Sequence, residues 1–373
     1  MDEERRSEQR ERRAPQSAGE ACGVCHADLR SGQKPDTSKW LATLAAHVTV
    51  RYRDGIEITL STGERVVCDA DEPDGDVNVV SHAHGDHLYE RAPDAVVWSE
   101  LTRELAAVRR DEVPATADDD RITLVDAGHV PGARAAVVED PDGTTYCYTG
   151  DLSTREHRYL DGFEAPDGMD VDVLVIESTY GEPEYVFPPP AEATAAFREW
   201  VAETDAPVLV FAYSLGRAQE VQLILGGTDR QVHVTDAVAA LNEPIADAYG
   251  LDFPVRRYGS DVELDAGDAL VLPAQTNRLS FVEAIVEETG ARKTALSGWA
   301  VDSSFRFAGG YDATFPLSDH CDFEELLAVV EAVDPEQVYT CHGSTDSLAR
   351  EVRSRLGYEA RALKRNQTSL GEF

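Results

Sequence analysis

Lysine is almost missing from this 373-residue chain, which contains only Lys34, Lys39, Lys293 and Lys364. Acidic residues outnumber basic ones by 70 to 34, and the formal net charge is −36. The charge is spread along the chain, which argues against a single acidic interaction segment. Because salt screens the self-repulsion of such a surface, the composition predicts a protein of a salt-rich cytoplasm. An acidic surface also repels nucleic acids, so any nucleic-acid site here needs local basic residues or metal ions.

Long apolar runs are also missing. No run approaches the roughly 18 residues that a membrane-spanning helix needs, which excludes a membrane protein. The charged beginning of the chain lacks the apolar core of a secretory signal, and residues 1–45 are interpreted as a disordered tail. Hydrophobic residues make up 42% of the chain, enough for an ordinary globular interior. The length predicts two domains, or one domain with a large insertion.

Cysteine is sparse, with six scattered residues and no secretory context, so reduced thiols in a cytosol are expected instead of disulfides. The stretch "CGVCH" (22–26) resembles half of a zinc ribbon or a c-type haem site. No second CxxC motif accompanies it. We therefore interpret it as a small element of the tail without a catalytic role, although metal binding with help from elsewhere stays open.

Hydrophobic periodicity predicts different secondary-structure arrangements in successive parts of the chain. Residues 48–70 alternate between apolar and polar, as antiparallel hairpin strands do, and residues 99–110 have helical spacing behind Ser99 as N-cap. Further strands are predicted at 77–80, 122–127, 133–140, 144–150 and 171–178. A helix at 188–204, a strand–turn–helix unit at 206–225 and a strand at 293–300 then favour a parallel α/β unit. A last strand at 335–343 precedes a helix from about 345 to 356.

The stretch "VVSHAHGDHL" (79–88) holds three of the ten histidines of the chain within six residues, directly behind a predicted strand. In an extended backbone His82 and His84 point the same way and can bind one ion, whereas Asp86 and His87 suit a second ion. Imidazole with carboxylate is a ligand set that zinc favours, with manganese or iron as alternatives. The competing interpretation is an ordinary polar surface loop.

Three further candidates follow apolar strands elsewhere in the chain, namely His129, Asp151 and His342. A single histidine or aspartate in such a place is more often structural. Three of them at strand ends, each with glycine nearby, favour a common site, because enzymes with sheets build their sites at one sheet edge.

The order Asp69, HxHxDH (82–87), His129, Asp151 and His342 resembles the metallo-β-lactamase superfamily. That resemblance implies an α/β fold, the αββα metallo-β-lactamase sandwich, with two metal ions at one sheet edge. It assigns His82, His84 and His129 to the first ion. It assigns Asp86, His87 and His342 to the second ion, with Asp151 as the bridge. Asp69 would stand behind these ligands and hold their loop.

Four further stretches resemble the β-CASP nucleases within that superfamily: "VLVIESTYGEP" (173–183), "FAYSLGRAQEV" (211–221), "ALSGWA" (295–300) and "LSDHCDFEEL" (317–326). In this resemblance Glu177 matches the motif A acid, His320 the motif B histidine and His342 the motif C histidine. The implied architecture is a metallo-β-lactamase domain at 46–183, an inserted α/β β-CASP domain at 184–316 and a return to the first domain at 317–373.

Phosphodiester hydrolysis suits these residues. Two ions, here two Zn²⁺ with Mn²⁺ or Fe as alternatives, activate water and neutralise the phosphate, with Asp86 and Asp151 in the catalytic set. His320 is expected to protonate the departing oxygen and Glu177 to orient or charge that imidazole. The alternative for Glu177 is a strand-end residue that caps the next turn.

Substrate phosphates have a candidate site in "FAYSLGRAQE", where Ser214 is expected as an N-cap ahead of Gly216 and Arg217. The free amides of a helix start and an arginine fork both bind anions. An ordinary capped helix is the alternative. Ser297 and Gly298 form a weaker second candidate.

The histidine at motif C favours RNA as the substrate, of the mRNA 3′-end-processing or RNA-turnover type. The stretches 177–190 and 211–219 look most like DNA exonucleases found beside bacterial DNA ligases, so single-stranded DNA stays open. A non-catalytic nucleic-acid-binding partner subunit is a third hypothesis, and a thioester hydrolase is disfavoured by the motif A and B matches. We expect no membrane partner, and the sequence leaves the oligomeric state open.

Overall fold

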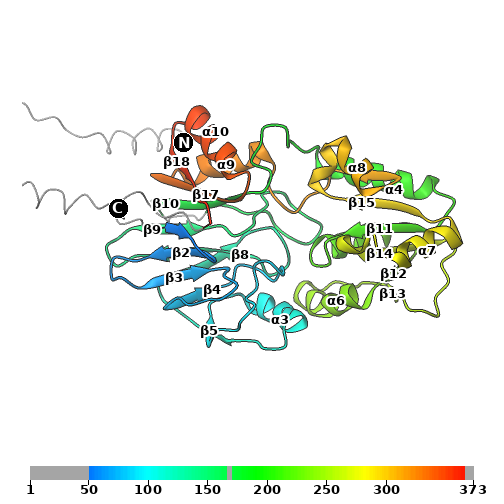
Figure 1. The fold of residues 1–373 in the computed structure, drawn as a ribbon, viewed down its shortest axis with the longest axis horizontal. Coiled ribbons are helices and arrows are strands. Elements are labelled where there is room, and N and C mark those ends of the chain that lie inside the picture. The colour runs from blue at the N-terminus through cyan, green and yellow to red at the C-terminus, as the bar shows by residue number, and fades with distance from the viewer. Residues whose placement is uncertain (1–49, 166–169, 366–373) are drawn as a thin grey trace, which may run out of the picture. The chain divides into compact units, whose positions relative to one another are not determined.

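The computed structural model describes residues 50–165 and 170–365 (Figure 1). The predicted tail at 1–45, with its Cys22, Cys25 and His26, lies outside the described residues. Within the described part of the chain, no helix combines the length and the apolar character needed to cross a bilayer.

The first sheet has four strands in the order β1-β2-β3-β4. They span Val50–Tyr52 (β1), Ile56–Thr59 (β2), Arg65–Cys68 (β3) and Val77–Val79 (β4). The first three pair as antiparallel hairpins, as the alternating pattern predicts, whereas β4 runs parallel to β3. Gly63 adopts a φ of 87° in the tight turn between β2 and β3, a conformation that glycine tolerates best. β4 leads directly into the histidine cluster.

The second sheet has six strands in the order β18-β17-β10-β9-β8-β7. They span Ile122–Asp126 (β7), Arg134–Glu139 (β8), Thr145–Tyr148 (β9), Val173–Ser178 (β10), Gln337–Gly343 (β17) and Glu359–Ala362 (β18). Strands β7, β8 and β9 are antiparallel, but β9, β10, β17 and β18 run parallel. The strand predicted at 171–178, β10, thus pairs in parallel with β9 and β17, because the chain crosses over before it returns to the sheet.

The two sheets share one apolar core, which identifies a sandwich. Ile56, Ile58 and Val66 of the first sheet pack in one buried cluster with Val138 and Val175 of the second. Burial of such side chains contributes about 1.5–3 kcal/mol each. On the far face of the second sheet, helices α9 (Phe323–Val333) and α10 (Thr345–Glu351) bury a separate cluster. A π-helical turn at Val352–Leu356 continues α10, so a helical segment spans the predicted 345–356.

Helix α3 (Glu100–Arg109) packs through Leu105 and Ala106 in a cluster with Val96 of strand β5 (Ala95–Val96), which pairs with β6 (Ala115–Thr116) in a small two-stranded sheet. Ser99 is the N-cap of α3 and accepts a hydrogen bond from the Thr102 amide at 3.0 Å, as predicted. The predicted α/β fold is confirmed, with two sheets packed face to face and helices on the outer face of the second.

The third sheet is parallel throughout, in the order β13-β12-β14-β11-β15-β16. Its strands span Val208–Ala212 (β11), Gln231–Val234 (β12), Arg256–Arg257 (β13), Asp268–Pro273 (β14), Arg292–Leu296 (β15) and Ala313–Phe315 (β16). All six come from the predicted insertion, whose boundaries at 184 and 316 stay a prediction.

Helices alternate with these strands, as the sequence predicts for an α/β unit. They span Pro190–Glu203 (α4), Arg217–Leu225 (α5), Asp236–Tyr249 (α6), Ser280–Thr289 (α7) and Ser303–Gly309 (α8), with 3₁₀ turns at Ala274–Thr276 (η1) and Gly298–Val301 (η2). Helices α4, α5 and α6 contribute to one buried apolar cluster, and α7 to a second one. The inserted sheet is therefore covered on both faces, as all-parallel sheets are.

Candidate metal centre

Four predicted ligands from three strand ends converge at one sheet edge. His82 follows β4, His129 follows β7 and Asp151 follows β9, and their ligand atoms and one of His84 all lie within 4.8 Å of one another. His84 Nδ1 lies 3.1 Å from His82 Nε2 and 3.2 Å from His129 Nε2. Asp151 Oδ2 lies 3.6 Å from each of these two Nε2 atoms. The structure therefore brings together three imidazoles and one carboxylate, called the inner group below.

The inner group has the chemistry of a cation site. Burial, and then the neighbouring imidazoles, lowers the pKa of His82 well below its usual value and that of His84 to about 3. Burial also lowers the pKa of His129. Neutral imidazoles present lone pairs to one another across about 3 Å, an arrangement that a shared cation satisfies and a hydrogen-bond network does not. Nitrogen ligands with one carboxylate suit a borderline ion such as zinc.

The outer nitrogens of these three rings are held by the protein. His82 Nδ1 lies 2.9 Å from Ser81 Oγ, and His129 Nδ1 lies 2.7 Å from the carbonyl oxygen of Asp319. His84 Nε2 lies 3.2 Å from the carbonyl oxygen of Leu215, in the loop that follows β11. A carbonyl acceptor keeps the proton on the outer nitrogen, so the inner nitrogen of that ring faces the site unprotonated. The inserted sheet thus helps to orient one ring of the inner group.

His87 lies on the other side of Asp151. Its Nε2 is 3.3 Å from Asp151 Oδ2, and its Nδ1 is 2.9 Å from Asp69 Oδ2. Burial opposes protonation of this ring, but the charges of Asp151 and Asp69 outweigh it and raise the pKa of His87 well above its usual value. Asp69 also accepts hydrogen bonds from the amide and hydroxyl of Ser81 and from Tyr148 Oη, at 2.6–2.8 Å. The loop that carries His82, His84, Asp86 and His87 is called the ligand loop below. Asp69 therefore ties the ligand loop to two strands.

The last two predicted ligands, Asp86 and His342, stand apart from the close groups of donors. Asp86 is exposed, and His342 sits on β17 with a φ of 52°. The His342 ring centroid lies 5.4 Å from that of His87, and its buried Nε2 has no hydrogen-bond partner among the described residues. An unsatisfied buried nitrogen is costly. Because the His342 ring lies beside His87, its Nε2 would be a ligand for an ion bound on that side.

His320 and Glu177 form a pair at the rim of the inner group. His320 Nδ1 lies 2.8 Å from Glu177 Oε1, and the His320 ring centroid lies 4.4 Å from that of His129. Glu177 is fully buried and also accepts the amides of Leu152 and Thr179, at 2.9 and 3.2 Å. Burial disfavours the imidazolium, but Glu177 and then Asp151 outweigh this and raise the pKa of His320 to about 10. The buried Glu177 carboxylate thus favours the protonated form of the His320 ring.

A cavity of about 870 Å³ opens over these residues. Its wall includes His84, Asp86, His87, Asp151, Ser214, His320 and His342, together with residues that the sequence analysis did not single out, namely Tyr52, Arg109, Tyr213, Lys364 and Arg365. Half of the Tyr213 surface is exposed, and its ring lies 6.1 Å from that of His84. No local pattern marks these five residues, because the elements that carry them meet only in the folded chain.

The predicted phosphate site differs from the structure. Gly216, with a φ of 87°, is the N-cap of α5, and the expected N-cap role of Ser214 is wrong. The Gly216 amide donates to Gln219 Oε1 at 2.9 Å, so this first amide is already occupied. Arg217 is 1% exposed; it pairs with Glu220 and lies 3.6 Å from Asp319. Its guanidinium therefore faces buried carboxylates, because α5 turns this side chain inward.

Ser297 and Gly298 lie at the start of the turn η2. Ser297 accepts a hydrogen bond from the Trp299 amide at 3.4 Å. A Cβ atom on Gly298 would come within 2.6 Å of the rings of Tyr180 and Phe187. Close packing against these rings accounts for this glycine, and both residues line a hollow of only about 30 Å³ beside Arg217.

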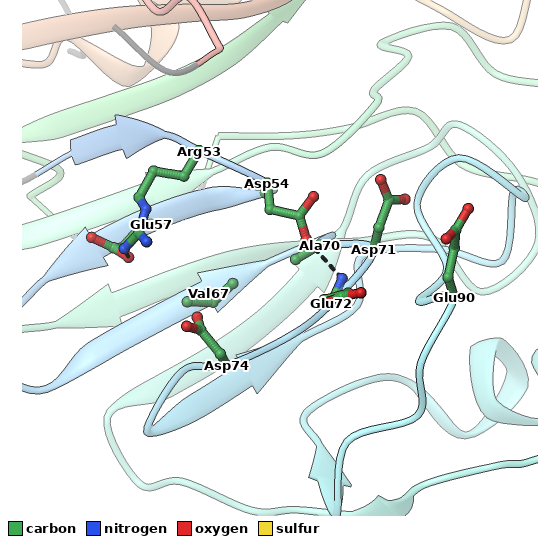
Figure 2. A pocket seen from close by; sticks show the side chains of 10 residues that line it. Arg53, Asp54, Glu57, Val67, Ala70, Asp71, Glu72, Asp74 and Glu90 are labelled. Carbon is green, nitrogen blue, oxygen red and sulfur yellow. Dashed lines mark hydrogen bonds and ion pairs between the residues drawn. The ribbon is translucent and has the colours of Figure 1, made fainter. Parts of the chain in front are cut away.

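A separate hollow of about 360 Å³ is acidic (Figure 2). Asp54, Asp71, Glu72, Asp74 and Glu90 line it, and the Glu72 amide donates to Asp54 Oδ2 at 2.7 Å. No imidazole lines this hollow. It therefore contrasts with the larger cavity, which His84, His87, His320 and His342 help to line.

Residues 313–363 match the family model described as the Zn-dependent metallo-hydrolase RNA specificity domain. The chain is 43% identical over 108 residues to cleavage and polyadenylation specificity factor subunit 3 of Dictyostelium discoideum, covering 28% of this chain and 13% of that protein. It is 27% identical over 209 residues to an RNase J-like protein of Methanocaldococcus jannaschii, covering 47% and 48%. The chain belongs to the β-CASP family of the metallo-β-lactamase superfamily.

The β-CASP chain is also 33% identical over 308 residues to a probable DNA ligase of Opitutus terrae, covering 78% of this chain and 29% of that protein. The chain thus spans less than half the length of each of these relatives. A crystal structure of a protein of unknown function from Enterococcus faecalis superposes with a TM-score of 0.56 at 13% identity, over 85% of this chain and 98% of that one. This last likeness concerns the fold alone.

Proposed function

We propose that this β-CASP protein is a zinc-dependent nuclease that hydrolyses phosphodiester bonds of RNA. The observation that carries the proposal is the inner group of three imidazoles and Asp151, with His320 held by Glu177 at 2.8 Å at its rim. The match of residues 313–363 to an RNA specificity domain supports RNA as the substrate. Such an enzyme would act in the cytoplasm, and a salt-rich cytoplasm stays a prediction from the net charge of −36.

His82, His84 and His129 would hold one zinc ion and Asp86, His87 and His342 a second, with Asp151 between them. When bound, two ions supply an activated water molecule and neutralise charge on the attacked phosphate. His320, protonated and held by Glu177 at 2.8 Å, would donate its proton to the departing oxygen. Glu177 is itself held by two backbone amides, so it positions the imidazole and stabilises its charge.

The proposal is tested with end-labelled RNA and single-stranded DNA of the same sequence, incubated with zinc-loaded protein at high salt. We expect faster cleavage of the RNA. Cleavage of neither substrate by folded protein with two bound ions would contradict the nuclease function. Cleavage of DNA alone would support phosphodiester hydrolysis but would show that the substrate is DNA and not RNA.

His320→Ala tests the assigned proton donor. We expect a rate lower by at least about 100-fold at unchanged zinc content, because general acid catalysis contributes about 10²–10⁴-fold. His157→Ala is the matched control, since this histidine lies outside the wall of the cavity and is buried beside Glu220. Loss of zinc from the His320 variant would assign this residue to the metal site instead.

Single-strand DNA exonuclease activity is the second candidate. It is favoured by the likeness to the probable DNA ligase of Opitutus terrae, which covers 78% of this chain. A non-catalytic partner subunit fits less well, because the donors of the inner group and the His320–Glu177 pair are all present.

A further inference from the structure

Two consecutive arginines end α3 beside the ligand loop, and their surroundings differ. Arg110 donates to the backbone carbonyl of its neighbour Arg109 at 3.4 Å and to three carbonyls of the ligand loop and its continuation, those of Tyr89 at 2.9 Å, Gly85 at 3.0 Å and Leu88 at 3.4 Å. Arg110 therefore has a structural use, which is to hold this loop.

Arg109 has no such partner. It lies on the wall of the cavity that holds the metal centre, and its buried Nε has no hydrogen-bond partner among the described residues. The charges that act on it are the repelling Arg110 and the attracting Asp86. No ion pair links Arg109 to a carboxylate in the described part of the chain, although acidic residues outnumber basic ones two to one. A buried donor on a charged group that lacks a partner is costly, so this site calls for an anion from outside.

The other cations on the cavity wall are already paired. Lys364 Nζ lies 2.9 Å from Asp346 Oδ2. Arg365 Nη2 lies 3.0 Å from Asp54 and 3.5 Å from Asp71, two carboxylates of the acidic hollow in Figure 2. Among the described lysines and arginines of this wall, Arg109 alone has no ion pair.

Asp86 does not remove the need for an anion. This carboxylate is exposed, and no hydrogen bond or ion pair joins it to Arg109 among the described contacts. In the proposed function Asp86 is a ligand of the second ion, and the positive charge of that ion neutralises the carboxylate. Arg109, which lines the cavity, then has no protein acceptor for its buried Nε, and an arginine fork suits a phosphate group.

We propose that Arg109 binds a phosphate of the substrate strand and so sets the position of that strand across the metal centre. This inference rests on the proposed nuclease function and names a residue for the binding of its substrate. In a protein of net charge −36, the bulk surface repels a polyanion, so binding depends on such local contacts. Arg217, whose guanidinium lies against Glu220 and Asp319, is not needed for this contact.

The test measures binding of a fluorescent single-stranded RNA to zinc-loaded protein in a His320→Ala background, over a range of salt concentrations at which the protein is folded. Arg109→Gln should weaken binding about tenfold, as loss of a charge-assisted contact does. It should also lower the slope of log affinity against log salt by about 0.7, the value for one phosphate contact to a single strand. Arg109→Lys should keep the slope and lose part of the affinity, because the charge stays and the fork is lost.

Arg103→Gln is the matched control, since Arg103 lies on the same helix and pairs with Glu100 instead of facing the cavity. Its slope and affinity should equal those of the parent. With an otherwise wild-type enzyme, Arg109→Gln should raise KM about tenfold and change kcat less than about twofold, a split that a merely structural role would not produce.

An unchanged slope and KM in Arg109→Gln, with an active wild-type enzyme, would overturn this inference alone. Loss of zinc in Arg109→Gln would also overturn it, because Arg109 would then support the ligand loop. A wild-type protein that neither binds nor cuts RNA or DNA would overturn the proposed function together with this inference.

Discussion

The inner group and the outer pair, Asp86 and His342, lie in the same cavity, but the protein holds their side chains in place to different degrees. The three rings of the inner group are each held through their outer nitrogen, at 2.7–3.2 Å from an oxygen of the protein. Asp86 is exposed, and the buried Nε2 of His342 lacks a partner among the described residues. A site whose ligands are already oriented loses little entropy when an ion binds. The inner group should therefore bind its ion first and more tightly.

The largest effect is expected where the two sides meet. Asp151 Oδ2 lies 3.6 Å from His82 Nε2 and 3.3 Å from His87 Nε2. Asp151→Asn should therefore lose both zinc ions and reduce the nuclease rate by at least about 1000-fold. Metal analysis and single-turnover cleavage measure this. Asp126→Asn, an exposed carboxylate on β7, is the control, and retention of two ions by the Asp151 variant would refute a shared ligand.

His342→Ala separates the two sides. We expect one zinc ion per chain to remain and the rate to fall about 100-fold, because the inner group keeps its own hydrogen bonds. Metal analysis after dialysis against a weak chelator gives the stoichiometry. Loss of both ions would mean that the inner group depends on the outer pair, contrary to the comparison.

Asp69→Asn tests the support behind His87. The amide cannot match the charged acceptor that lies 2.9 Å from His87 Nδ1, so zinc affinity should fall about 10–100-fold. Competition with a chromophoric chelator measures the affinity. Asp140→Asn is the matched control, because this buried carboxylate accepts the Ser61 amide at 2.7 Å on the same sandwich. Equal losses of zinc affinity in the two variants would show a general effect of stability instead.

Ser99→Ala should have the smallest effect. Ser99 Oγ caps α3 and donates to the Gly132 carbonyl, in the turn that follows His129, at 2.7 Å. Loss of an N-cap lowers the free energy of unfolding by about 1 kcal/mol. Urea unfolding measures this change, while zinc content should stay at the wild-type value. A loss of zinc from this variant would show that the inner group is less rigid than its contacts indicate.

Much of the sandwich was predictable from local pattern. The hairpins of β1, β2 and β3 follow from alternation and Gly63, and α3 follows from its spacing behind Ser99. Strand ends with His or Asp beside glycine pointed to one sheet edge, and the inner group lies at that edge. The parallel pairing of β10 with β9 and β17 was not predictable in this way, since strand pairing joins segments that are far apart along the chain.

By itself, the sequence determined the hairpin strands of the first sheet, the alternation of strands and helices in the third sheet, and the imidazoles and carboxylates at strand ends, because hydrophobic period and residue type are local properties. Only the tertiary structure decided that Arg217 turns inward to Glu220 and that Arg109 faces the cavity without an ion pair. It also decided that a carbonyl of the inserted segment, at Leu215, holds His84. Burial and partners decide what a charged side chain does, and both depend on residues that meet only when the chain folds.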